Sequence, residues 1–155
     1  MKMDMKIIIP VGLVIFLGIF LQTSFILIES VDTPQKIAIK FCKAFYKMQT
    51  CADKYVTKDG KMVDDVDLLE KYRYEMSKIA KEQGYRDSYA KKYLFNIKTH
   101  TISQSHEEAK IKLTCNKAAI IPWLRTRRLY NVDNVFTLVK ENHKCKISGG
   151  IESLN

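Results

Sequence analysis

The amino-acid sequence predicts an α+β fold in which an N-terminal transmembrane helix precedes two or three helices packed on one face of a curved four-stranded antiparallel sheet. Three observations predict it. An apolar run occupies residues 7–28, apolar residues recur at helical spacing between 34 and 93, and apolar and polar residues alternate between 95 and 148. We therefore expect a short cytoplasmic tail at 1–6, a signal-anchor helix at 7–28 and an extracytoplasmic domain at 33–152.

The apolar run from Ile7 to Ile28 contains no charged residue. At about 1.5 Å per residue, a helix of this length measures roughly 33 Å, which suffices for the hydrocarbon core of a bilayer. Lys2 and Lys6 precede the run, so the N-terminus is expected in the cytoplasm and the chain is expected to cross the cell membrane once. A cleaved secretory signal is the alternative, although no pair of small residues suited to cleavage follows the run.

Length, composition and net charge exclude several classes of protein. The chain has 155 residues, 46% of them hydrophobic, and 26 Lys and Arg against 17 Asp and Glu give a net charge of +9. These values exclude a disordered tail and a multi-domain enzyme. The charge suits nucleic acid, but the predicted compartment excludes that partner. The sequence has no Cys/His spacing typical of zinc or haem sites, so we expect neither a metal nor a cofactor.

The first helix of the soluble part is predicted from Pro34 to about Tyr55. Thr33 is a favourable cap and Pro34 a favourable first residue. Apolar residues at spacings of three and four form one side of this helix. Lysines recur on the other side, where they are either solvated or face anionic lipid headgroups: Lys36, Lys40, Lys43 and Lys47.

A second helix is predicted after a turn at 58–61, with Asp64 or Asp65 as its cap and Gly84 at its end. A further short helical stretch is expected up to Tyr93. Beyond it, the two-residue alternation predicts four strands near 95–101, 109–116, 129–140 and 143–148, joined as a meander. In the first of them, Phe95, Ile97, Thr99 and Thr101 are predicted on the buried side.

Three segments resemble the nuclear-transport-factor-2-like (NTF2-like) superfold, and in particular small bacterial membrane-attached and lipoprotein domains. They are IKFCKAFY at 39–46, EEAKIKL at 107–113 and FTLVKENHKCKI at 136–147. In those relatives a Trp often stands near the position of Cys145, so this chain departs from the pattern there. The resemblance implies a sheet that wraps around a helix as a cone. The inner-membrane assembly subunit of type IV secretion systems shares this layout.

Cysteines are expected to join the helix layer to the sheet. A bridge between Cys42 and Cys51 would break the predicted helix, and Cys115 and Cys145 lie too far apart if one strand separates theirs. Two helix-to-sheet disulfides therefore remain, with either pairing open, and four buried free thiols are the alternative.

Two further regions are candidate sites. In a cone, tyrosine hydroxyls could line a small-ligand pocket: Tyr46, Tyr55, Tyr72 and Tyr93. The loop AAIIPWLRTRRLYN at 118–131 interrupts the strand pattern and holds residue types enriched at protein interfaces: Trp123, Arg125, Arg127 and Arg128. The alternative for this loop is an ordinary hairpin. The histidines His100, His106 and His143 fall on outward or turn positions, so no catalytic residue is predicted.

These observations favour a non-enzymatic, membrane-anchored accessory or assembly subunit that binds a membrane protein or a second copy of itself. The alternatives are a small-ligand or weakly catalytic, isomerase-like pocket in the cone, and a type IV secretion assembly component.

Overall fold

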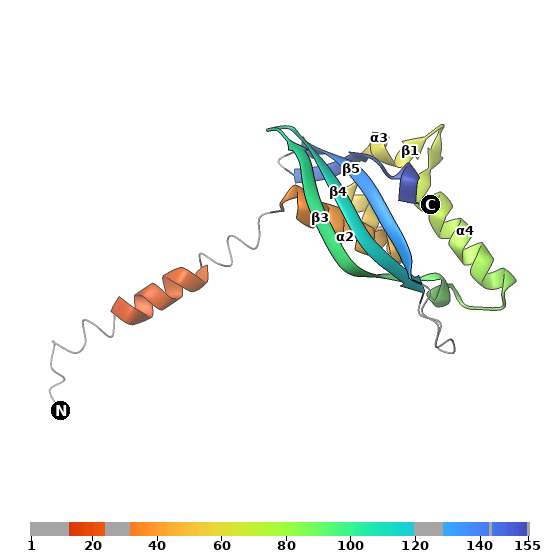
Figure 1. Cartoon of the computed structure of the whole chain (residues 1–155), viewed down its shortest axis with the longest axis horizontal. Helices are drawn as coiled ribbons and strands as arrows, with labels where there is room; N and C mark the ends of the chain where they lie inside the picture. Colours follow the sequence, from red (N-terminus) through yellow and green to blue (C-terminus); the bar gives the residue numbers. More distant parts are fainter. Residues whose placement is uncertain (1–12, 24–31, 120–128, 143, 155) are drawn as a thin grey trace, which may run out of the picture. The chain divides into compact units, whose positions relative to one another are not determined.

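The computed structural model describes residues 13–23, 32–119, 129–142 and 144–154 (Figure 1). The chain divides into two compact units, Met1–Asp32 and Thr33–Asn155. In the first unit, residues 13–23 are helical. The second unit is α+β and contains a four-stranded antiparallel sheet.

The predicted transmembrane helix at 7–28 is wrong for the part of it that the structure describes. No helix among the described residues is long and apolar enough to cross a membrane. The helical residues 13–23 measure about 16 Å, roughly half the hydrocarbon thickness of a bilayer. This finding also contradicts the predicted signal anchor and the single-pass membrane placement.

Helix α2 (Pro34–Tyr46) begins as predicted, with the Thr33 hydroxyl accepting a hydrogen bond from the Lys36 amide. It ends at Tyr46, nine residues before the predicted Tyr55, because Met48 adopts a left-handed conformation with φ +57°. After this break the chain continues as the 3₁₀ helix η1 (Thr50–Tyr55). Ala52, after the break, is still buried. The prediction that Ala52 faces the core is therefore confirmed, although the predicted continuous helix is wrong.

The predicted cap of the second helix is also wrong. Asp64 and Asp65 both have positive φ and form the turn of a small hairpin between β1 (Met62–Val63) and β2 (Val66–Asp67). Carboxylate and amide residues tolerate this conformation better than most. The cap of α4 (Leu68–Glu82) is instead Asp67, whose Oδ1 accepts hydrogen bonds from the amides of Leu69 and Glu70.

The short elements beside these helices are α3 (Lys58–Lys61), which precedes the hairpin, and the 3₁₀ helix η2 (Asp87–Ala90). Helix α4 ends as predicted just before Gly84, which has φ +76°. Glycine adopts this conformation without a steric penalty, and it closes many helices in this way. A last 3₁₀ turn, η3 (Glu152–Leu154), follows the sheet.

The sheet is a meander of β3 (Lys92–Gln104), β4 (Glu108–Ala119), β5 (Tyr130–Glu141) and β6 (Lys144–Gly149), in that order. We call the face toward α2 the inner face and the opposite face the outer face. Figure 1 shows α2 across one side of β3, β4 and β5. At the β6 edge, Val56 forms a bridge with Ile147, so this edge is covered.

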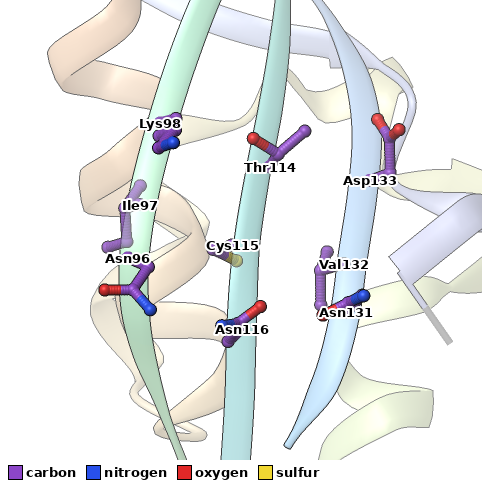
Figure 2. Close-up of a pocket in the computed structure, with 9 residues that line it drawn as sticks. All are labelled: Asn96, Ile97, Lys98, Thr114, Cys115, Asn116, Asn131, Val132 and Asp133. Atoms are coloured by element: carbon purple, nitrogen blue, oxygen red, sulfur yellow. The ribbon is translucent and has the colours of Figure 1, made fainter.

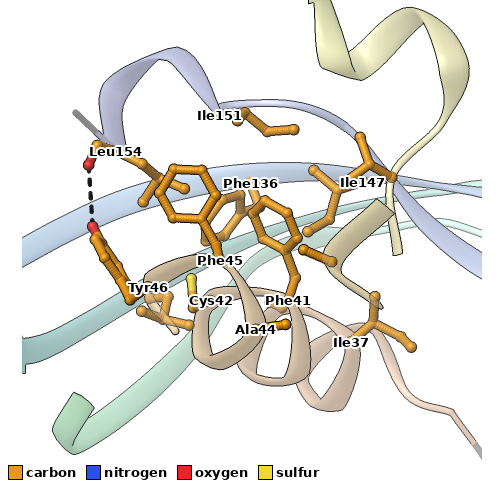
Figure 3. Close-up of a cluster of buried hydrophobic side chains, with 14 of the residues drawn as sticks. Ile37, Phe41, Cys42, Ala44, Phe45, Tyr46, Phe136, Ile147, Ile151 and Leu154 are labelled. Atoms are coloured by element: carbon orange, nitrogen blue, oxygen red, sulfur yellow. Dashed lines mark hydrogen bonds between the residues drawn. The ribbon is translucent and has the colours of Figure 1, made fainter. Parts of the chain in front are cut away.

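An aromatic cluster fills the space between α2 and the inner face (Figure 3). Phe41 meets Phe136 edge to face, with ring centroids 5.8 Å apart. Phe45 stacks at 4.2 Å on Tyr72, through which α4 is attached to α2. Both geometries are favourable for aromatic pairs. The inner side of the sheet is therefore a packed core built on large rings.

Candidate functional site

A hollow of about 590 Å³ lies on the outer face of the sheet. Figure 2 shows polar side chains of three strands on this face, while Cys115 lies on the side toward α2. The nine lining residues come as three consecutive residues from each strand: Asn96, Ile97 and Lys98 from β3, Thr114, Cys115 and Asn116 from β4, and Asn131, Val132 and Asp133 from β5. We call this feature the outer hollow.

Strand pairing places these polar side chains side by side. Asn116 pairs with Asn131, and Thr114 pairs with Asp133. Residues paired in this way point to the same face of a sheet, with Cβ atoms about 5 Å apart. On the other flank, Lys98 pairs with Thr114. The outer hollow therefore presents amide, hydroxyl, ammonium and carboxylate groups over a short distance, and together they both donate and accept hydrogen bonds.

A β-bulge in β3 shapes one wall of the hollow. The register shifts between Phe95 and Lys98, and Asn96 within it has φ +51°. The extra residue reverses the side-chain alternation, so Phe95, which pairs with Asn116, lies on the outer face and is 37% exposed. The prediction that Phe95 lies on the buried side with Ile97 is wrong for this reason.

The outer face as a whole carries more lysines than carboxylates. By strand register its charged side chains are Lys98, Lys110, Lys112, Lys144 and Lys146, against Glu108, Asp133 and Glu141. Three of the lysines form ion pairs, including Lys112 with Asp133 at 2.9 Å and Lys146 with Glu141 at 2.7 Å. Among the described residues, Lys98 and Lys144 have no carboxylate within 4.0 Å. The outer face is therefore basic, and the ammonium group of Lys98 places a positive charge at the outer hollow.

The tyrosines predicted to line a pocket do not gather around one space. Tyr46 and Tyr72 are buried in the aromatic cluster, and the Tyr46 hydroxyl donates to the carbonyl of Leu154 at 3.2 Å. Burial raises the pKa of Tyr72 to about 12, so its hydroxyl stays protonated at neutral pH. Tyr55 is half-buried, and Tyr93 is exposed beneath the Lys47 ammonium, 5.4 Å from its ring centroid.

The predicted disulfides are wrong: Cys42, Cys51, Cys115 and Cys145 are all free thiols. Each packs in or against the hydrophobic core instead, as a small apolar side chain. Burial raises the pKa of the Cys42 thiol well above its usual value, and the nearby Cys115 adds to this effect. Cys42 is thus an unreactive thiol at neutral pH.

The remaining predicted sites are placed as follows. The lysines of the predicted basic stripe lie on α2 or just after it, with Lys40 and Lys43 exposed and Lys36 and Lys47 half-buried. His100 and His106 are exposed. The predicted interface residues Trp123, Arg125, Arg127 and Arg128, and also His143, lie outside the described residues.

Sequence reasoning missed the outer hollow because its residues looked like the solvated side of ordinary strands. One signal was available. Asn is uncommon inside strands and enters the left-handed region more readily than most residues, so Asn96 near the start of a predicted strand indicated a bulge.

No group of three or more His, Cys, Asp or Glu side chains able to hold a metal ion occurs within the described ranges. No family model matches the chain, and no curated protein matches its sequence.

Proposed function

We propose that the unit Thr33–Asn155 is a non-enzymatic protein-interaction domain whose outer hollow binds an acidic polypeptide segment of a partner protein. The observation that carries the proposal is the outer hollow itself, about 590 Å³ in size, whose lining includes three asparagines, a threonine, a lysine and an aspartate beside Ile97, Cys115 and Val132. An antiparallel sheet commonly leaves one face in water. A face that only contacts water does not require a hollow lined by so many hydrogen-bonding groups, so the outer hollow indicates a binding surface.

The chemistry of the hollow suits a polypeptide. Asn96, Asn116 and Asn131 each carry an amide group with two donors and an acceptor, which matches the N–H and C=O groups of an extended chain. On the same face Phe95 and Val135 are 37% and 40% exposed and offer apolar contacts beside the polar groups. Apolar anchors within a polar, hydrated rim are typical of protein interfaces.

The charge of the outer face favours an acidic partner. Lysines outnumber carboxylates there, and Lys98 at the hollow has no carboxylate within 4.0 Å among the described residues. The protein as a whole carries a charge of +9, which accelerates the approach of an acidic partner. The packed inner side, with Phe41, Phe45 and Tyr46 buried, favours this surface over a pocket in the core.

Charge reversal on the outer face tests the proposal. The full-length protein is purified with its bound proteins from the cells that express it, as wild type and as Lys98→Glu with Lys110→Glu. The matched control is Lys71→Glu with Lys81→Glu, which changes the net charge equally at two exposed positions of α4.

We expect wild type and control to retain a partner with an acidic segment, and the outer-face variant to lose it, at least tenfold, in line with about 1.4 kcal/mol or more of lost charge interaction. Raised salt should also weaken the complex. Equal recovery of the partner by the two double variants would contradict the proposal, as would recovery of a second copy of the chain alone.

A further inference from the structure

Two half-buried lysines lie close together on the inner face, at the end of the sheet where β3 begins and β4 ends. Lys92 pairs in register with Ala119, and Leu94 pairs with Lys117. Lys92 and Lys117 are therefore diagonal neighbours on the same face of adjacent strands, a relation that places Cβ atoms about 7 Å apart. Both side chains are half-buried.

Each of these lysines lies against an aromatic ring instead of a carboxylate. The Lys117 ammonium is 4.9 Å from the ring centroid of Tyr46, and the Lys92 ammonium is 6.0 Å from that of Tyr72. Within the described part of the chain, no carboxylate oxygen lies within 4.0 Å of either ammonium. The face of an aromatic ring stabilises a cation by about 1 kcal/mol. It does not neutralise the charge, so the two ammonium groups stay without a counter-ion among the described residues.

Loss of solvation disfavours the charged form of both lysines, and repulsion from Lys117 also disfavours that of Lys92. Burial lowers the pKa of Lys92, and the positive charge of Lys117 lowers it further. Burial likewise lowers the pKa of Lys117. An anion placed between the two ammonium groups would oppose both effects.

An apolar cavity of about 140 Å³ adjoins Lys92. The other lining residues come from α4, the turn after it and η2: Met76, Ile79, Ala80, Gln83, Tyr85, Tyr89 and Ala90. At roughly 30 Å³ for each non-hydrogen atom, the cavity holds about five such atoms. An apolar chamber with an ammonium group in its wall suits a molecule with a short hydrocarbon chain and an acidic end.

A buried hydroxyl on α4, the helix that lines one side of this cavity, also lacks a hydrogen-bond partner among the described residues. Tyr72 is 4% exposed, and its hydroxyl is the one buried side-chain polar atom without a partner in the described part of the chain. Tyr72 precedes Met76 by one helical turn and Ala80 by two, so the three lie along the same side of α4. A buried hydroxyl without a partner costs about 1–3 kcal/mol, which a ligand oxygen would recover.

We propose that Lys92 and Lys117 hold the carboxylate of a small aliphatic acid whose chain of about five carbons occupies the cavity between α4 and η2. This site lies on the inner face and is separate from the outer hollow, so either proposal can fail without the other.

Titration of the full-length protein with hexanoate, followed by amide chemical shifts in NMR, tests the proposal. We expect saturable shifts centred on Ala80, Ala90, Lys92 and Lys117. Hexanol, which has the chain but no charge, should bind at least tenfold more weakly, and hexylammonium should not bind.

Lys92→Met and Lys117→Met remove the charge and keep an unbranched apolar side chain, so the fold should tolerate them. Each should weaken hexanoate binding about tenfold or more, whereas Lys81→Met at an exposed position of α4 should leave it unchanged. Absence of saturable shifts, equal binding of hexanol, or unchanged binding by the Lys92→Met/Lys117→Met double variant would overturn the assignment. Shifts centred on Asn116 and Asn131 would overturn it too.

Discussion

At the scale of single residues, a polar network around Asn134 holds the C-terminal segment against the sheet. Asn134 is 4% exposed and donates to the carbonyl of Gly150 at 2.6 Å, while its own carbonyl oxygen accepts from the Ser153 hydroxyl and the Val135 amide. Gly150 has φ +88°, and a Cβ atom there would overlap the carbonyl oxygen of Val135. The network therefore requires glycine at this position.

Gly150→Ala should destabilise the protein by about 3 kcal/mol or more, since it combines a strained backbone with a clash in a packed region. Gly84→Ala is the matched control, because Gly84 also has positive φ but no atom within 4 Å of an added Cβ. Gly84→Ala should lower the free energy of unfolding by about 1 kcal/mol. Urea unfolding of both variants checks the difference, and equal losses would show that Val135 does not constrain position 150.

The same scale shows where prediction from sequence fails. The alternation in the strand predicted near 109–116 places Ile111 and Leu113 on one side, and both are fully buried. In β3 the rule fails at Phe95, because the bulge at Asn96 inserts one residue and reverses the faces. A period of two carries no information on where an extra residue enters, so the alternation alone does not predict this wall of the outer hollow, and Asn96 is the one local signal for it.

At the scale of elements, helix starts are predicted better than helix ends. Thr33 and Pro34 fix the start of α2 by local chemistry. Its end depends on the left-handed conformation of Met48, which no local preference of methionine predicts. The Met48 amide donates to the carbonyl of Phe45 at 2.9 Å, so the backbone itself closes the helix there.

Asp67 has two separable roles in α4. Its Oδ1 caps the helix, and its Oδ2 lies 2.7 Å from the Lys61 ammonium. Partial burial raises the pKa of Asp67, but the Lys61 ammonium and the amides of Glu70 and Leu69 outweigh this effect and hold the pKa below its usual value. The charged form of Asp67 is therefore the one that stabilises the fold.

Asp67→Ala should cost about 1–2 kcal/mol of stability at pH 7, because it removes the cap and the ion pair. Asp67→Asn keeps an oxygen for the cap and should cost less than about 1 kcal/mol. A lowered carboxyl pKa contributes stability above the unfolded pKa of about 3.9 and loses it as the pH falls through the folded value. The gap between wild type and Asp67→Asn should thus close below about pH 4 in thermal unfolding, and a gap that persists at pH 2 would exclude this role for the charge.

At the scale of the whole molecule, the α+β class and the four-stranded meander follow from patterns that repeat over many residues. Long alternation and helical spacing average over local exceptions, so the order of the two main helices and the four sheet strands could be predicted, whereas the short β1–β2 hairpin was missed. The predicted transmembrane helix at 7–28 is wrong for the residues that the structure describes, because hydropathy measures how apolar a segment is and not the length of the helix that it forms. The resemblance to NTF2-like domains remains an expectation of the sequence.

Neither candidate site is apparent from the sequence pattern alone. The outer hollow and the Lys92–Lys117 pair each combine residues of neighbouring strands, and both depend on register across β3 and β4. Register is set by the buried face and by bulges, so residues such as Asn116 and Asn131 come together only in the folded sheet.

The measurement that tests the central claim most directly is site-specific photo-crosslinking of the full-length protein in the cells that express it. A photoreactive residue at Asn116, in the outer hollow, is compared with one at Lys81, exposed on α4. The account predicts one dominant crosslinked protein at position 116, attached through an acidic peptide, and no such product at position 81. Absence of a product at position 116, or the same product at both positions, would contradict it.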